Sequence, residues 1–270
     1  MFGPKPALFT WRQDSGKDRL TAFSSRTAII AAMPGELKPF LDQNAKEGWV
    51  HEKRGNVHLW RLTWPDDQGE WIAACAGAGQ QAATHAFAEV EKDGPITSAI
   101  SVGWVGALTE EAKPGKAYKV SEVVDSRTGE RFQVAQWSEE CLLVTSPTVA
   151  DAAEKQRLAA AYNAALVDME ATAVARLAAM RGIPFYCCKG VSDGFSEDLI
   201  DFNRFITPDG QFKMGKLLIY VLPRPWHWPA LIRMGENSKH ASQSIAECLF
   251  DFLDERGHIR KRNGYPNFKR

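Results

Sequence analysis

One stretch, residues 164–194, constrains the fold most, because it alternates short apolar runs with one amphipathic helix. Residues 165–167 predict a strand and residues 171–180 a helix, whose apolar side chains recur at helical spacing until Gly182. Residues 183–191 predict a second strand, and its long apolar run is typical of a strand covered on both faces. A β-α-β unit of this kind places both strand ends at one edge of the sheet, where α/β proteins bind ligands.

Acidic residues follow both predicted strands. Asp168 and Glu170 come after the first strand, and Ser192 and Asp193 come after the second. Because the two strands end at the same edge of the sheet, we expect these carboxylates to lie close together. A single carboxylate at a strand-to-helix turn would favour simple helix capping. Two at matching positions in consecutive units favour a functional site.

The two motifs at these turns, VDMEATAVA and GVSDG, resemble the nucleoside phosphorylase superfamily. Its nearest well-known branch is the methylthioadenosine/S-adenosylhomocysteine nucleosidases. The resemblance implies an α/β fold, a three-layer α/β/α sandwich around a mixed β-sheet, and a homo-oligomer with a dimer favoured. It implies that Glu170 holds the ribose hydroxyls and that Met169 lies against the sugar. It also implies that Asp193, next to Ser192, protonates the purine at N7.

A second family-like segment lies near the N-terminus. Residues 27–33, TAIIAAM, predict a buried strand, and Glu36 follows in the first turn of a short helix through Leu41. In the nucleosidases that this segment resembles, a glutamate at this spacing activates water. Pro34 and Gly35 replace the acidic residues that the family carries there, so the match rests on spacing. Glu36 also suits the positive end of the helix dipole, and the two roles are compatible.

Two glycine-containing segments resemble the parts of the family that hold phosphate in phosphorolytic members. The turn AGAGQ contains Gly79 and ends in Gln80, where the family carries lysine. Residues 100–108, ISVGWVGAL, predict a strand with Gly103 followed by Trp104, where phosphorolytic members carry serine. The resemblance implies that both glycines and Trp104 border the substrate, with the indole as a hydrophobic wall. The missing lysine and serine favour water over phosphate as the nucleophile.

The loop at residues 146–151 resembles the segment that recognises adenine in the family, through its backbone and a stacking aromatic side chain. Val149 and Ala150 stand at these positions, so the resemblance implies that they contact the base. The helix that follows is predicted to turn Ala152, Leu158 and Ala159 inward.

The remaining segments predict a β-meander over residues 48–76, a strand over residues 113–125 and a hairpin around residues 128–129. Residues 195–210 predict an acidic, aromatic lid. Beyond it, a short apolar helix is interrupted by prolines, and a final helix spans residues 236–256. The prolines concerned are Pro223, Pro225 and Pro229.

Trp226 and Trp228 stand between these prolines, where they predict either an interfacial patch that allows peripheral membrane contact or a core-packed cover over the pocket. We favour the cover. This proline-interrupted tail also resembles the hopanoid-associated phosphorylase branch of the superfamily. The predicted boundaries are an N-terminal extension (1–26), the nucleoside phosphorylase-like domain (27–256, with 195–256 as lid and helical cover) and a basic tail (257–270).

Charge and composition limit the classes of partner that this chain is expected to bind. The formal net charge is zero and the basic residues are scattered, which argues against a nucleic-acid partner and favours a small molecule. The five cysteines have no metal-like spacing and predict buried free thiols in a reducing cytoplasm. No signal peptide is apparent, and the apolar run 217–222 is too short to span a membrane. We expect no metal and no cofactor.

Together these features predict a nucleosidase that hydrolyses the N-glycosidic bond of a purine nucleoside, such as methylthioadenosine, S-adenosylhomocysteine or another 5′-modified adenosine. Glu36 would activate water and Asp193 would protonate the base. Two alternatives remain open. One is a purine nucleoside phosphorylase, with phosphate held by Arg127 or Arg131. The other is a nucleoside-binding, membrane-surface relative without catalytic activity.

Overall fold

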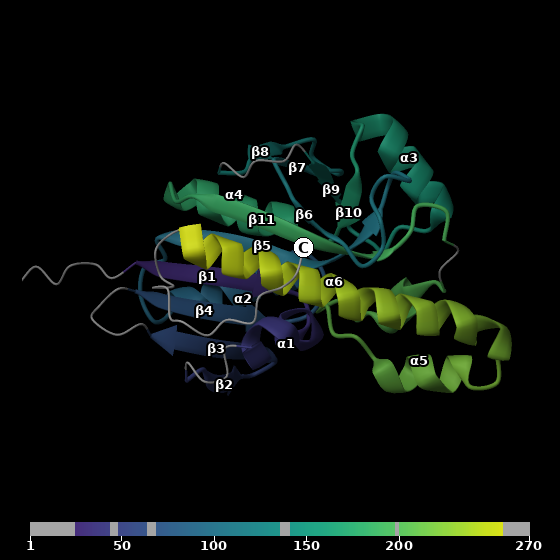
Figure 1. Cartoon of the computed structure of the whole chain (residues 1–270), viewed down its shortest axis with the longest axis horizontal. Helices are drawn as coiled ribbons and strands as arrows, with labels where there is room; N and C mark the ends of the chain where they lie inside the picture. Colours follow the sequence, from purple (N-terminus) through teal and green to yellow (C-terminus); the bar gives the residue numbers. More distant parts are fainter. Residues whose placement is uncertain (1–24, 44–47, 64–68, 136–140, 198–199, 256–270) are drawn as a thin grey trace, which may run out of the picture.

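The computed structural model describes residues 25–43, 48–63, 69–135, 141–197 and 200–255. These residues form one mixed sheet of eleven strands with helices on both faces (Figure 1). The strands are β1 (Arg26–Ala31), β2 (Val50–Arg54), β3 (Val57–Thr63), β4 (Glu70–Cys75), β5 (Ser98–Ala107), β6 (Ala117–Lys119), β7 (Glu122–Asp125), β8 (Arg131–Gln133), β9 (Leu142–Thr145), β10 (Leu166–Asp168) and β11 (Phe185–Asp193). The α-helices are α1 (Pro34–Gln43), α2 (Gln80–Glu91), α3 (Ala152–Tyr162), α4 (Ala171–Arg181), α5 (Met214–Val221) and α6 (Trp228–Glu255), with 3-10 turns η3 (Phe202–Phe205) and η4 (Pro225–His227).

The sheet has the strand order β2-β3-β4-β1-β5-β10-β9-β7-β8, and β11 pairs with both β5 and β6. β1 runs parallel to β4 and β5, and β11 runs parallel to β5. β10 runs antiparallel to β5 and parallel to β9, so the sheet is mixed. The carboxyl ends of β1, β10 and β11 meet around the second half of β5, and the site lies there.

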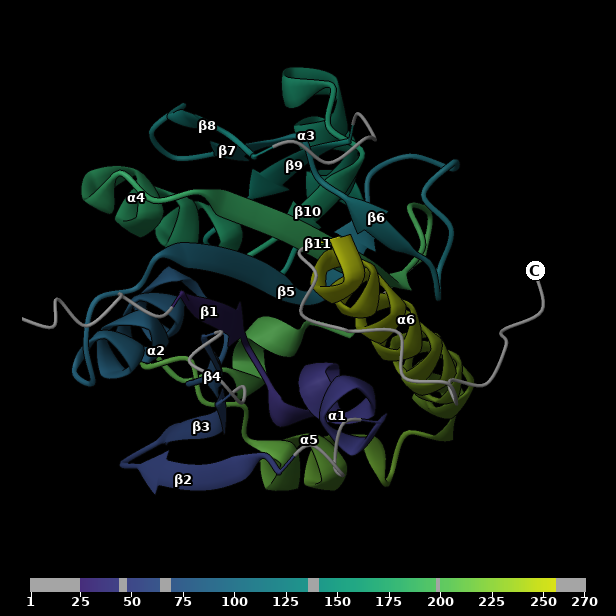
Figure 2. The ribbon, with the colours of Figure 1, turned by 60° about the vertical axis from the view of Figure 1, so that its left-hand side comes forward.

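Two hydrophobic clusters cover the two faces of the sheet, so the fold has the predicted three layers (Figure 2). Helices α2 and α4 pack together on one face, and α1 and α6 pack together on the other. Buried side chains such as Phe87 and Val174 belong to the first cluster, and Trp71, Phe40 and Leu249 belong to the second. Strands β1 and β5 are buried on both sides, which explains why their sequences show no polar alternation.

Strand β5 changes its neighbour halfway along, and this creates an opening in the sheet. β1 pairs with β5 only as far as Ser101, whereas β10 pairs with β5 from Gly106 onward. On the other side, β11 pairs with β5 along the whole stretch from Ala99 to Gly106. The residues of β5 between Ser101 and Gly106 pair with neither β1 nor β10. They therefore face the space where these two strands end.

The predicted strands and helices that carry the site are confirmed, with ends displaced by one or two residues. The predicted parallel β-α-β arrangement of residues 165–167 and 183–191 was wrong, because β10 runs antiparallel to β5 and β11 runs parallel to it. The segment 113–125 differs, because it forms two short strands, β6 and β7, on different partners. The final helix begins at Trp228 rather than at residue 236. Pro229 does not interrupt it, since proline is tolerated in the first turn, where the backbone N–H has no helical partner.

The expectation that Trp226 and Trp228 are packed in the core was wrong. Their side chains are 68% and 46% exposed. The five cysteines are buried and free, as predicted. No described helix is both long enough and apolar enough to cross a membrane. Most of the predicted N-terminal extension and the basic tail at 257–270 lie outside the described residues.

Candidate functional site

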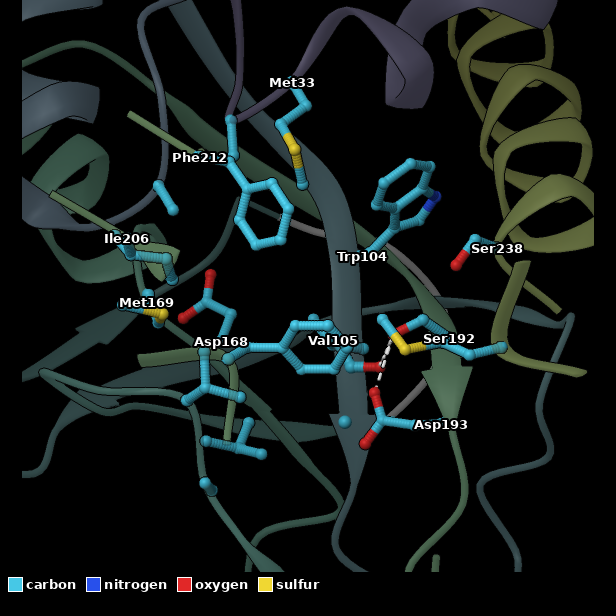
Figure 3. A pocket seen from close by; sticks show the side chains of 18 of the residues that line it. Met33, Trp104, Val105, Asp168, Met169, Ser192, Asp193, Ile206, Phe212 and Ser238 are labelled. Carbon is cyan, nitrogen blue, oxygen red and sulfur yellow. Dashed lines mark hydrogen bonds between the residues drawn. The ribbon is translucent and has the colours of Figure 1, made fainter. Parts of the chain in front are cut away.

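A pocket of about 300 Å³ lies where β1, β10 and β11 end beside the second half of β5. Figure 3 shows Met33, Trp104 and Phe212 turned into the same space as Ser192 and Asp193. Of the residues predicted for the site, those that line the pocket are Glu36, Trp104, Val149, Ala150, Met169, Glu170, Ser192 and Asp193. The fold thus brings together eight of the ten predicted residues, from segments more than 150 positions apart in the sequence.

Glu36 lies almost completely buried at the start of α1, with 2% of its surface exposed. One carboxylate oxygen accepts the backbone N–H groups of Ala32 (2.7 Å) and Met33 (2.9 Å), and the other accepts that of Trp104 (2.9 Å). Trp104 lies in the stretch of β5 between its β1 and β10 pairings. A carboxylate has about four acceptor positions, so one remains for a water molecule. Burial raises the pKa of Glu36, while the three backbone N–H groups and Lys189 oppose this effect.

Glu170 precedes α4 and faces the glycine turn. Its Oε1 accepts the backbone N–H of Gly79 at 2.6 Å. Burial, followed by the negative charge of Asp168, raises the pKa of Glu170 to about 8, although Lys189 acts in the opposite direction. Near neutral pH the surroundings of Glu170 therefore favour its protonated form, which can both donate and accept a hydrogen bond. Such a group matches a sugar hydroxyl, which also donates and accepts.

Asp168 and Lys189 form a fully buried ion pair beneath this part of the site, with Nζ and Oδ2 2.9 Å apart. Two further acceptor positions of Asp168 are used by the Thr145 hydroxyl (2.7 Å) and the Ala171 backbone N–H (2.9 Å). The carboxylate of Asp168 thus caps α4 and joins β9, β10 and β11. It lines the pocket, but its polar atoms are engaged in holding the strand ends together.

Asp193 is the last residue of β11, and its two carboxylate oxygens contact different partners. The Ser192 hydroxyl lies 2.7 Å from Oδ1 and 3.2 Å from the Val105 carbonyl oxygen, and either can accept its proton. The Lys155 ammonium group contacts Oδ2 and also donates to the Gly194 carbonyl oxygen at 2.7 Å. Asp193 therefore sits in the pocket wall in direct contact with a positive charge from α3.

Glycines in β5 make room for both carboxylates. A Cβ at Gly103, whose φ is +144°, would lie 2.9 Å from Glu36 Oε1. A Cβ at Gly106 would lie 3.1 Å from both Asp193 Oδ2 and the Lys155 side chain. Gly103 therefore lies behind Glu36 rather than in the pocket lining, where it was predicted. Gly79 likewise lies behind the pocket wall, and its N–H orients Glu170.

The loop predicted to recognise the base is already paired within the protein. The carboxamide of Asn203 accepts the N–H of Val149 (2.9 Å) and donates to its carbonyl oxygen (3.0 Å). The side chain of Val149 still lines the pocket, as does Ala150. A ligand that used the backbone groups of Val149 would have to displace Asn203 first.

The segment after β11 closes the pocket on its apolar side. Apolar residues from η3, α5, α6 and the segment between η3 and α5 line this side, namely Phe202, Ile206, Phe212, Met214, Leu217, Leu231 and Met234. The cover is attached to the glycine turn, because the N–H of Ala78 donates to Gly210 (2.8 Å) and the side chain of Gln211 donates to Ala76 (2.5 Å). One end of the pocket is therefore charged and the other apolar.

Lys155 is the site residue that the motifs did not indicate. It lies on the inward side of α3, between the half-buried Ala152 and the buried Leu158, at helical spacing from both. This position on an apolar helix face is the signal that could have identified it. Among the described residues that line the pocket, Lys155 is the only one with a basic side chain. The described residues contain no cluster of side chains suited to hold a metal ion.

Comparisons with known proteins agree with this geometry. Residues 128–215 match the model of the phosphorylase superfamily. No curated protein matches the chain. Among solved structures, the chain is similar to the 5′-methylthioadenosine/S-adenosylhomocysteine nucleosidase of Helicobacter pylori in complex with butyl-thio-DADMe-Immucillin-A. The identity is 15%, the TM-score is 0.64, and the match covers 86% of this chain and 99% of that one.

Two further structures are similar to the same degree. The 5′-methylthioadenosine nucleosidase of Arabidopsis thaliana has 16% identity and a TM-score of 0.64, with 87% of this chain and 97% of that one covered. The futalosine hydrolase of H. pylori has 14% identity and a TM-score of 0.64, with 86% and 98% covered. These matches confirm the predicted resemblance: residues 128–215 match the phosphorylase superfamily, and the chain has the fold of its nucleosidases.

Proposed function

We propose that the chain is a nucleosidase that hydrolyses the N-glycosidic bond of a purine nucleoside, with adenine as the base. The observation that carries this proposal is the presence of Glu36 and Asp193 in one pocket, each buried and each held by a different set of partners. Glu36 keeps one acceptor position for water, and Asp193 contacts a hydroxyl and an ammonium group. Breaking the bond requires both kinds of group.

The proposed mechanism divides the work between these two carboxyl groups. As the bond breaks, positive charge develops on the ribose and negative charge on the departing base. Glu36 takes a proton from water, which attacks the sugar, and Asp193, which has taken up a proton from solvent before the reaction, gives that proton to the base. The Lys155 ammonium group stabilises the carboxylate that remains on Asp193 after this transfer. Glu170 and Met169 contact the ribose, and its hydroxyl groups bond to the Glu170 carboxyl.

Water rather than phosphate is the proposed nucleophile. A phosphate dianion needs cations or clustered donors. Among the described pocket-lining residues the basic side chain is Lys155, which is already bonded to Asp193 and Gly194. Arg127 and Arg131 do not line the pocket, and Arg131 forms an exposed ion pair with Glu122 at 2.7 Å. The Glu36 carboxylate, which acts as the base in this mechanism, would repel a phosphate anion.

The apolar end of the pocket supports a substrate whose ribose carries an apolar 5′ substituent, such as methylthioadenosine. S-adenosylhomocysteine is disfavoured relative to it, because its charged amino-acid end would lie among the side chains of the apolar cover. We further propose a homo-oligomer, with a dimer favoured, in the cytoplasm. The five buried free thiols support a reducing compartment.

The test is a base-release assay on adenosine, inosine, methylthioadenosine and S-adenosylhomocysteine, with phosphate raised from nil to tens of millimolar (~50 mM, well above a typical KM). We expect adenine and free sugar at a rate independent of phosphate. A phosphate-dependent rate with a sugar 1-phosphate product would establish a phosphorylase instead. Tight nucleoside binding by calorimetry, without base release, would establish a binding protein. The Asp193→Asn variant is the control for contaminating activity.

A further inference from the structure

One surface of the molecule is unusually apolar for an exposed region. Nine large apolar side chains of the described residues are exposed, and seven of these lie between residues 214 and 232. These seven are Met214, Leu218, Ile219, Leu222, Trp226, Trp228 and Ile232. They belong to α5, η4 and the first turns of α6, which we call the docking hairpin (residues 213–233). The hairpin extends beyond the end of the sheet (Figure 1).

The docking hairpin is a packed element, so its apolar exposure is part of the fold. Leu217 and Val221 of α5 are buried in a small core with Phe202 and Phe205 of η3. The indole N–H of Trp228 donates to the Val221 carbonyl oxygen at 2.9 Å, which joins the start of α6 to the end of α5. The exposed residues Leu218, Ile219 and Leu222 therefore point outward because the opposite side of α5 is already covered.

The charged side chains of the docking hairpin are all basic. Between Asp209 and Glu236 the sequence contains no acidic residue, but it contains Lys213, Lys216, Arg224 and Arg233. Among the described residues, Arg233 pairs with Glu197 at 3.2 Å, whereas the Arg224 guanidinium lies over the Tyr220 ring and bonds to a carbonyl oxygen. A cationic segment in a chain of zero formal net charge is complementary to an anionic surface.

We propose that the docking hairpin binds the surface of an anionic lipid bilayer. An amphipathic element with outward leucine, isoleucine and tryptophan side chains and flanking basic residues is suited to the boundary between headgroups and acyl chains. The inner side of the same hairpin lines the pocket through Leu217 and Leu231. Binding would therefore place the apolar end of the pocket next to the membrane. The proposal does not depend on the reaction proposed above.

The experiment is flotation of the full chain with vesicles of phosphatidylcholine alone or with roughly a third phosphatidylglycerol, at ~0.1 and ~0.5 M NaCl, a range over which charge screening increases strongly. We expect binding to the anionic vesicles that weakens at least about tenfold at the higher salt. The triple variant Ile219→Gln/Leu222→Gln/Trp226→Gln should lose at least about tenfold in vesicle binding. The matched control Val50→Gln/Met180→Gln removes exposed apolar side chains elsewhere and should bind as the wild type does.

Several outcomes would overturn the proposal. The first is a wild type that does not float with anionic vesicles. The second is a triple variant that binds these vesicles as well as the wild type does. The third is a control variant that loses as much binding as the triple variant. Sedimentation gives the competing result: if the triple variant converts a dimer to a monomer and the wild type binds no vesicles, the surface joins two copies of the chain. Base release from a water-soluble nucleoside without vesicles should be unchanged in the triple variant. A failure of the nucleosidase proposal would therefore appear in the base-release assay and would leave the vesicle-binding result unaffected.

Discussion

The buried Glu170 carboxyl should make the stability of the protein depend on pH in a defined direction. Burial and Asp168 raise the pKa of Glu170 from 4.5 to about 8. The folded chain keeps this proton up to about pH 8, whereas the unfolded chain releases it near pH 4.5. The folded chain therefore binds more protons across this interval, and the free energy of unfolding falls as the pH rises. Glu170→Gln is neutral at every pH and should remove this contribution.

The size of this change in stability follows from the difference between the pKa of Glu170 in the folded chain and in the unfolded chain. At roughly 1.36 kcal/mol per pH unit, the free energy of unfolding of the wild type should fall by about 3 kcal/mol between pH 5.5 and pH 9 because of this group. The Glu170→Gln variant should not show this fall. This is an upper value, because the pocket can admit water when the carboxyl group ionises. The Gly79 N–H that bonds to Glu170 can still bond to the glutamine oxygen, so the variant should fold.

The assay is urea denaturation followed by tryptophan fluorescence at several pH values between 5.5 and 9. The matched control is Glu154→Gln, because bonding to Arg157 lowers the pKa of Glu154. That residue is ionised in both states over this range, so its variant should differ from the wild type by a constant amount. If the difference between Glu170→Gln and wild type also stays constant to within about 1 kcal/mol, Glu170 is not held protonated and the argument is refuted.

Three further variants test the roles assigned to the pocket. Asp193→Asn should lose at least ~100-fold in turnover while remaining folded, and undiminished adenine release would remove Asp193 from the mechanism. Glu170→Gln should distinguish ribosides from 2′-deoxyribosides less well than the wild type in paired kcat/KM measurements, since the lost carboxyl group bonds to the hydroxyl; an unchanged preference would contradict this. Lys155→Met should be destabilised by ~3–5 kcal/mol because it leaves the buried Asp193 unpaired, and the double variant with Asp193→Asn should recover much of this loss. Equal stability of the single and double variants would count against the pair.

Local signals in the sequence were sufficient for the elements that carry the site. The apolar run before Asp168 and the one before Asp193 each predict a strand, and the helix between them ends at a glycine. These features depend on neighbouring residues, which is why the two strands and the helix between them were predicted correctly, whereas the parallel arrangement of the two strands was not. The carboxyl ends of the two strands still meet beside the second half of β5, because the strands approach it from opposite ends, and Glu36 joins them because β1 also ends there.

Features that depend on long-range pairing were not predictable in the same way. Lys155 lies on the inward side of the predicted helix AAEKQRLAAAY, but the sequence does not show its partner, because its contact with Asp193 spans 38 positions. Gly103 was assigned to the pocket itself because the motif does not show that Glu36 folds over it. The opening beside β5 depends on where β1 and β10 end, and this is a property of strand order and direction.

The attachment of the cover to the glycine turn gives the protein an internal reporter of pocket opening. The backbone N–H of Ala78 is bonded to Gly210 in the cover, while the next residue of the turn, Gly79, bonds to Glu170 in the pocket. The hydrogen on Ala78 can exchange with deuterium only when the cover separates from the turn. A ligand that tightens this contact should therefore slow exchange at a single amide, so occupancy of the pocket can be followed by mass spectrometry or NMR without any turnover.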